Sequence, residues 1–195
     1  MTTSGRIELM APAGNFESMQ AALDNGCDSI YFGVEQLNMR ARATVNFVLD
    51  DLPEIARRCN EKNVRTYLTL NTIIYDHDLS IVKTLLTKAK EAGITAVIAS
   101  DQAVIMTART MGMEVHISTQ LNVTNIETVK FYAMFADTIV LSRELSLRQV
   151  KKITDDIEKE QVKGPSGNLV EIEIFGHGAL CMAVSGKCYL SLHSH

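Results

Sequence analysis

Two cysteines, Cys181 and Cys188, stand seven residues apart in a glycine-rich stretch of the 195-residue sequence. Paired thiolates of this kind can bind zinc or an iron–sulfur cluster, but a closed site needs four ligands and this stretch shows only two. Spacing alone therefore leaves free thiols as the more common interpretation. The other two cysteines, Cys27 and Cys59, lie before a predicted strand and on the apolar side of a predicted helix, so we expect core thiols there.

Polar side chains follow nearly every apolar run of the sequence, and they divide by chemistry into two groups. Amides, hydroxyls and arginines could bind a substrate, and this group is Asn15, Asn38, Arg40, Arg42, Asn71 and Ser118. Groups that could transfer protons or stabilise charge are His116, Gln120, Arg143, Glu173 and His177. We expect both groups to surround one convergent pocket.

Several of these residues also have an ordinary structural interpretation. Asn15 and Asp101 stand where they could cap the helices that follow them. His116 lies within a predicted strand, where an imidazole bonded to its neighbours is at least as common as a catalytic one. Arg40 and Arg42 alternate on one face of an extended segment, which suits either a solvated pair or an anion site. Arg143 could form a simple surface ion pair with the glutamate after it.

The elements that must position these residues are strands and helices in strict alternation. Seven apolar, β-branched runs read as strands, at residues 7–10, 29–32, 65–70, 95–99, 114–117, 137–141 and 170–175. The stretches between them have helical periodicity, as at Leu52, Ile55 and Cys59. Such alternation predicts a parallel α/β sheet with right-handed crossovers.

A TIM-type (β/α) barrel is the favoured form of that sheet. A dinucleotide-binding fold would need G-x-G-x-x-G after the first strand, but residues 11–15 contain one glycine. A closed barrel needs eight strands, and the sequence shows seven. We therefore expect seven βα units, an incomplete barrel truncated before its eighth strand, and open sheet edges that could pair with another chain.

Composition sets broad limits on function. With 46% hydrophobic residues and no composition break, residues 1–195 read as a single domain. The net charge of −4 gives no overall field that would attract nucleic acid, so an RNA contact would need a local patch. No run approaches 18 apolar residues, so we expect a cytoplasmic protein without a membrane partner. P-loop, G-x-S-x-G and H-E-x-x-H motifs are absent from the sequence.

The cysteine stretch also carries a longer pattern, E-x-F-x-x-G-x-x-C-x-x-x-x-G-x-C-x-x-S, over residues 173–191. This run resembles the signature of the U32 peptidase family, known as collagenase-like proteases. Further matches to that family are Leu9-Met10-Ala11-Pro12-Ala13-Gly14, Tyr31-Phe32-Gly33, His116-Ile117-Ser118-Thr119-Gln120 and Leu141-Ser142-Arg143-Glu144-Leu145. The resemblance covers essentially the whole chain.

That resemblance implies a TIM-type barrel and one of two activities. Members are named as peptidases or collagenases, or are required to hydroxylate RNA bases or ubiquinone precursors. Several hydroxylation members carry a 4Fe-4S cluster on four cysteines, the first two spaced like Cys181 and Cys188. The other two lie further downstream in those members, so the cluster would be incomplete in this sequence and complete only in a full-length protein.

We therefore expect an enzyme that hydroxylates bases of tRNA or rRNA with a small-molecule oxygen donor. A peptidase acting on protein is the first alternative, using Cys181 or Cys188 with His177 or His116. A non-catalytic partner subunit is the second. The sequence leaves the substrate and the oligomeric state open.

Overall fold

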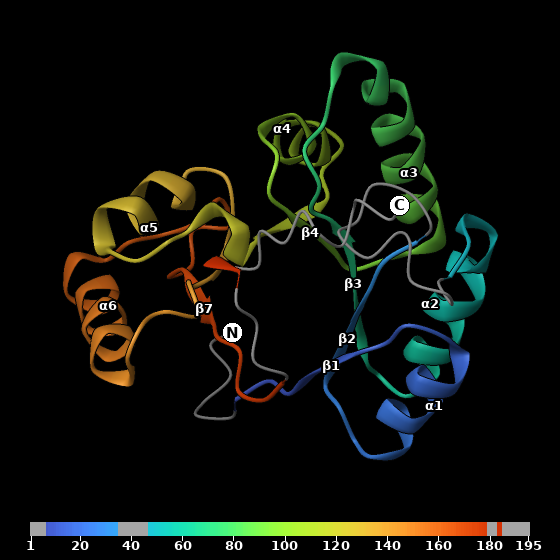
Figure 1. Ribbon diagram of the computed structural model, residues 1–195, viewed down its shortest axis with the longest axis horizontal. Helices are drawn as coiled ribbons and strands as arrows, with labels where there is room; N and C mark the ends of the chain where they lie inside the picture. Colours follow the sequence, from blue (N-terminus) through green and yellow to red (C-terminus); the bar gives the residue numbers. More distant parts are fainter. Residues whose placement is uncertain (1–6, 35–46, 179–182, 185–195) are drawn as a thin grey trace.

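The computed structural model describes residues 7–34, 47–178 and 183–184, in which strands and helices alternate (Figure 1). The parallel strands are β1 (Met10–Pro12), β2 (Ser29–Phe32), β3 (Arg65–Leu70), β4 (Ala96–Ala99), β5 (Glu114–Ile117), β6 (Thr138–Val140) and β7 (Glu171–Glu173). The α-helices are α1 (Phe16–Asp24), α2 (Leu52–Glu61), α3 (Leu79–Ala92), α4 (Gln102–Thr110), α5 (Ile126–Ala133) and α6 (Leu147–Glu160). Short 3-10 turns are η1 (Leu49–Asp51), η2 (Asp76–Asp78) and η3 (Thr119–Leu121).

The seven strands form one sheet in chain order, and each strand is parallel to its neighbours. Helices pack outside the curled sheet, as Figure 1 shows. Within the described residues β1 and β7 are the two edges of the sheet, so the barrel is not closed. The predicted incomplete TIM-type barrel is confirmed.

Both edge strands are shorter than predicted. The run expected at residues 7–10 becomes a strand only at Met10–Pro12, because the Leu9 backbone instead bonds to Asp28 at the entry to β2. The backbone oxygen of Leu9 and the backbone nitrogen of Ala13 both face β2. By the two-residue alternation of a strand, Pro12 then faces the open edge, where its missing N–H costs no ladder bond.

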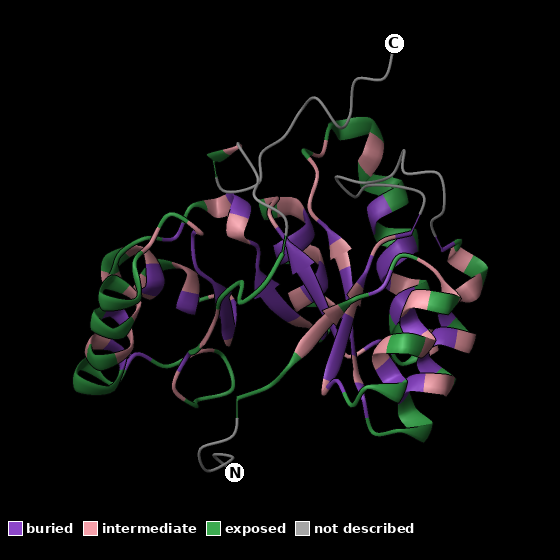
Figure 2. Ribbon diagram, turned by 60° about the horizontal axis from the view of Figure 1, so that its bottom comes forward, coloured by how far each residue is buried: buried purple, intermediate pink, exposed green. Residues whose placement is uncertain are grey.

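Two apolar layers hold the fold together. The larger lies between the sheet and the helices, and Figure 2 shows it as buried strands and buried inner faces of the surrounding helices. The smaller lies inside the barrel and contains Tyr67, Ala96 and Ile98, with Met10 and Tyr31 packed against it. In β5, Val115 and Ile117 belong to the outer layer, so the alternate residues of that strand face the barrel interior.

Local capping explains where two helices begin. The Asn15 side chain accepts a hydrogen bond of 2.7 Å from the Ser18 amide, and Ser18 Oγ accepts one from the Asn15 amide, which completes a capping box on α1. Asp101 caps α4 by accepting from the Ala103 amide at 2.8 Å.

In the part of the chain that the structure describes, no helix has the length and apolar character needed to cross a bilayer.

Candidate functional site

His116 lies on β5 and faces the inside of the barrel, with 2% of its surface exposed. Its Nε2 is 3.1 Å from Oε1 of Glu114 on the same strand. Its Nδ1 is 3.6 Å from Oε2 of Glu173 on β7, and its ring packs 4.5 Å from the ring of Tyr67 on β3. Both ring nitrogens therefore face carboxylates.

The carboxylate of Glu114 continues this contact into a wider network. Its Oε1 also accepts from Arg65 Nη2 at 2.9 Å, and Arg65 Nη1 donates to Glu8 at 3.2 Å. The Tyr67 hydroxyl donates to the other oxygen of Glu8 at 2.7 Å, and the Arg65 guanidinium lies over the Tyr67 ring. We call this set the interior charge cluster, which consists of Glu8, Arg65, Tyr67, Glu114, His116 and Glu173.

The interior charge cluster follows the layering of a TIM-type barrel. In such barrels a layer of inward side chains comes from alternate strands. Here β3, β5 and β7 supply five members, and Glu8 comes from the segment just before β1. The contacts between Glu114, His116 and Glu173 therefore pass from β5 to β7 across the intervening strand β6.

Burial and hydrogen bonding oppose each other at His116. Burial disfavours the imidazolium, but the hydrogen bonds and charges of Glu114 and Glu173 outweigh it and raise the pKa of His116 above its ordinary value. For Glu114, burial likewise opposes ionisation, and the contacts with His116 and Arg65 still lower the pKa of the carboxyl. The geometry thus favours a protonated His116 between two carboxylates.

A second group of polar side chains gathers where β5, β6 and β7 end. Ser118 is 2% exposed, and its hydroxyl accepts from the amide of Gln120, which is 6% exposed. Arg143 follows β6, donates from Nη2 to the Ala183 oxygen at 3.2 Å, and lies 5.7 Å from the ring centroid of Phe175. These side chains follow the carboxyl ends of the strands, which form the mouth of the barrel.

The structure places the other predicted site residues differently. Asn15 serves the capping box, Asn71 is partly buried directly after β3, and His177 is exposed after β7. His116 and Glu173 are in direct contact, and Gln120 neighbours Ser118 in one turn. The remaining five predicted residues lie outside the described residues, and they are Asn38, Arg40, Arg42, Cys181 and Cys188.

The sequence predicted two of the six members of the interior charge cluster, His116 and Glu173, and missed Glu8, Arg65, Tyr67 and Glu114. Arg65 and Tyr67 alternate on β3, as Glu114 and His116 do on β5. Polar residues at every second position of an otherwise apolar strand were the available signal. Glu8, before the first strand, had no such signal.

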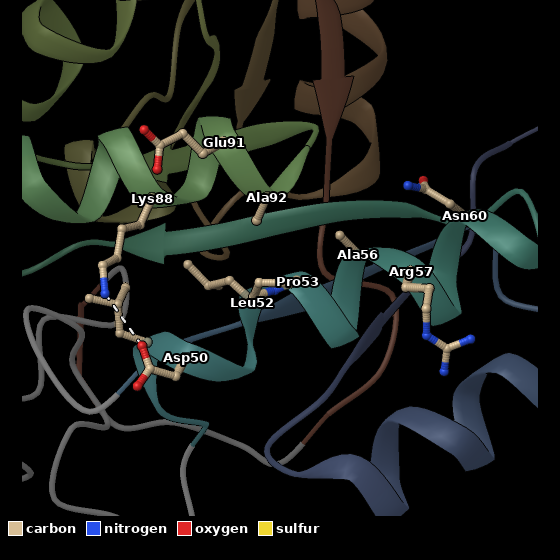
Figure 3. A pocket seen from close by; sticks show the side chains of 10 residues that line it. Asp50, Leu52, Pro53, Ala56, Arg57, Asn60, Lys88, Glu91 and Ala92 are labelled. Carbon is tan, nitrogen blue, oxygen red and sulfur yellow. Dashed lines mark hydrogen bonds and ion pairs between the residues drawn. The ribbon is translucent and has the colours of Figure 1, made fainter.

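A groove of about 490 Å³ lies away from this site, in the outer layer between α2 and α3 (Figure 3). Its residues include Leu52, Ala56 and Glu91, and a 3.3 Å ion pair joins Lys88 to Asp50 at one end. None of the predicted site residues that the structure describes lines it. Among the described residues, no group of three or more histidine, cysteine, aspartate or glutamate side chains is arranged to hold a metal ion.

Comparison with known proteins gives relatives of two kinds. The chain is 54% identical over 189 residues to a protein named Collagenase from Porphyromonas gingivalis, a match that covers 97% of this chain and 46% of that protein. It is 34% identical over 187 residues to "tRNA hydroxylation protein P" of Escherichia coli, covering 94% of this chain and 39% of that protein. The chain thus spans less than half of the length of these two curated relatives.

A solved structure has the same fold as this chain, and a family model matches its sequence. The structure of a U32 peptidase matches with a TM-score of 0.64 at 14% identity, over 89% of this chain and 70% of that one, which shows the shared fold. The model of Peptidase family U32 matches residues 14–195. Because that match spans nearly the whole chain, this protein is a member of peptidase family U32.

Proposed function

We propose that this chain forms the barrel of an enzyme that hydroxylates RNA bases, with an RNA substrate and a small-molecule oxygen donor bound at the ends of the strands. The observation that carries this proposal is the environment of His116. A histidine that activates a peptidase nucleophile turns one ring nitrogen to a carboxylate and the other to the nucleophile. Here both nitrogens face glutamates, so His116 is suited to hold charge inside the barrel.

The relatives support this proposal in part. Proteins named for tRNA hydroxylation match over almost the whole chain, including the barrel that holds His116 and Arg143. A peptidase is the second candidate, because the relative that is 54% identical is named Collagenase. In the described residues, no cysteine or serine approaches the ring nitrogens of His116 within hydrogen-bonding distance.

Cys181 and Cys188 would supply two of the four thiolates of a 4Fe-4S cluster in the full-length protein. Their thiols suit iron, and the support for this part of the proposal is their spacing and their match to the family pattern. A bound cluster would supply one-electron chemistry. Arg143 and Gln120 would bind the reacting partners at the strand ends, and Glu173 with His116 would fix the charge inside the barrel.

The test begins with the full-length protein produced without oxygen. We expect iron and visible absorption in the wild type, and loss of both in Cys181→Ala and Cys188→Ala. Cys59→Ala is the matched control, because Cys59 is a buried thiol on α2 that we expect to leave the iron content unchanged. RNA from cells that lack the gene should then be missing a hydroxylated base by mass spectrometry.

The opposite results would favour the peptidase. A colourless wild-type protein whose proteolysis disappears with either cysteine substitution, together with unaltered RNA in the deletion strain, contradicts the hydroxylation proposal.

A further inference from the structure

Among the described residues, three buried polar atoms at the strand ends have no hydrogen-bond partner: Thr72 Oγ1 after β3, Gln120 Oε1 after β5 and Arg143 Nε after β6. Buried polar groups are almost always hydrogen-bonded, so each exception calls for an explanation. Two further atoms without a conventional bond, His116 Nδ1 and Glu173 Oε2, face each other at 3.6 Å and so account for one another. The strand-end atoms have no such counterpart.

Backbone contacts bring Gln120 and Arg143 into neighbouring loops. The Thr119 hydroxyl donates to the Leu141 oxygen at 3.3 Å, and the Ser142 amide donates to the Val123 oxygen at 3.0 Å. The turn that carries Gln120 is thus held on both sides against the segment that leads into Arg143. On its other side Arg143 lies by the ring of Phe175, which is 50% exposed.

The chemistry of the two atoms limits what can bind. Arg143 Nε–H can only donate a hydrogen bond, and Gln120 Oε1 can only accept one. A carboxylate or phosphate would satisfy the arginine and leave the amide oxygen unbonded. The ligand must therefore offer an acceptor and a donor together, and the exposed ring of Phe175 offers it a flat surface for stacking.

We propose that Gln120 and Arg143 form a subsite that reads the hydrogen-bonding edge of a nucleobase, with Phe175 beside the base. This inference rests on the proposed function and names how its substrate is held. A base carries a donor and an acceptor side by side on one planar edge, whereas the N–H and C=O of a peptide group point in opposite directions. A base extruded from an RNA chain would present that edge to the mouth of the barrel.

The experiment uses uridine and 3-methyluridine, because one methyl group removes the only N–H on the uracil edge and keeps both carbonyl acceptors. Binding to the full-length protein is followed by NMR titration. We expect the wild type to bind uridine about tenfold more tightly than 3-methyluridine. Gln120→Leu should lose that preference by weakening uridine alone, and Gln120→Glu, which keeps an acceptor oxygen, should retain it.

Arg143→Lys removes the planar Nε–H and should weaken both nucleosides equally, since both retain their acceptors. Equal affinity of the wild type for the two nucleosides overturns the proposal, as does a preference that survives in a folded Gln120→Leu variant. Stronger binding of N-acetylalanine N-methylamide, in which both amides are secondary and trans, than of uridine overturns it in favour of a peptide. The RNA analysis separates the two claims, because a nucleoside preference with unaltered cellular RNA would support the subsite and contradict the hydroxylation activity.

Discussion

A protonated His116 lies in a place where an isolated imidazolium would be unstable. It is almost completely buried, and only the carboxylates of Glu114 and Glu173 make the protonated form favourable. Arg65 in turn holds Glu114 from β3. His116 is the most deeply buried charged group of the cluster, so removal of Glu114 or Glu173 would leave its charge less compensated.

Glu114→Gln is therefore predicted to lower the pKa of His116 and to destabilise the fold by about 2 kcal/mol near pH 6. In the wild type, the raised pKa of His116 stabilises the fold fully below its ordinary value of 6.5, and that stabilisation is lost as the pH rises through the folded value. The lowered pKa of Glu114 has the opposite effect. It stabilises the fold at pH values above the ordinary carboxyl pKa of 4.5, and that stabilisation is lost as the pH falls through the folded pKa of Glu114. The free energy of unfolding should therefore be greatest between about pH 4.5 and pH 6.5.

Urea denaturation at pH 4, 5.5 and 8 measures this dependence, and NMR of labelled histidine measures the pKa of His116. The variant should show a flatter pH profile than the wild type. Glu158→Gln, which changes an exposed glutamate on α6, is the control and should preserve the wild-type profile. An unchanged pKa of His116 in Glu114→Gln would contradict the charge pairing.

At the scale of elements, Asp101 connects two βα units near the site. One carboxylate oxygen accepts from the Ala103 amide and caps α4. The other accepts from the Ile74 amide at 3.3 Å, in the loop between β3 and α3. A single side chain thus starts one helix and holds the loop that leads to the preceding helix, beside the strand end that carries Thr72.

Asp101→Ala is predicted to cost about 1–2 kcal/mol, because it removes the α4 cap together with the loop contact. Asp101→Asn is the matched control: it keeps one oxygen for the cap, so its loss should be smaller. Chemical denaturation gives the free energies, and amide hydrogen exchange at Ile74 should accelerate in the alanine variant. Unchanged exchange at Ile74 would show that the loop is held by other contacts.

At the scale of the whole molecule, the two open edges of the sheet are the features that favour association with another chain. β1 and β7 each present one unpaired side among the described residues, and Ile7 and Leu9 beside β1 are 89% and 61% exposed. Unpaired strand edges with apolar neighbours template pairing with another chain. β7 pairs with β6 on one side, and inside the barrel the contact between His116 and Glu173 also links it to β5.

Residues 1–195 expressed alone are predicted to self-associate as concentration rises. The double substitution Ile7→Lys with Leu9→Lys should reduce that association, because charge at a strand edge opposes pairing. Light scattering after size-exclusion chromatography measures the mass. The free energy of unfolding, measured by urea denaturation, should stay within about 0.5 kcal/mol of the wild type, because both side chains are exposed. A wild-type chain that stays monomeric at all concentrations would contradict the prediction.

Local pattern in the sequence was enough to determine the alternation of strands and helices, the parallel sheet and the caps at Asn15 and Asp101. These features depend on residues within a few positions of one another, where periodicity and turn chemistry act. The motif from Glu173 to Ser191 was enough to indicate the family. The short edge strands were predicted too long, because hydrophobicity does not reveal which residues have a pairing partner.

Only the tertiary structure decided which polar residues meet. Glu8, Arg65, Glu114 and Glu173 are far apart in the chain, and their contacts with one another and with His116 depend on how the strands curl and align across the barrel. A sequence pattern records which face a side chain occupies and carries no information about its neighbour on a distant strand. The tertiary structure also shows that Asn15 caps α1, and that Gln120 Oε1 and Arg143 Nε are buried without a hydrogen-bond partner among the described residues.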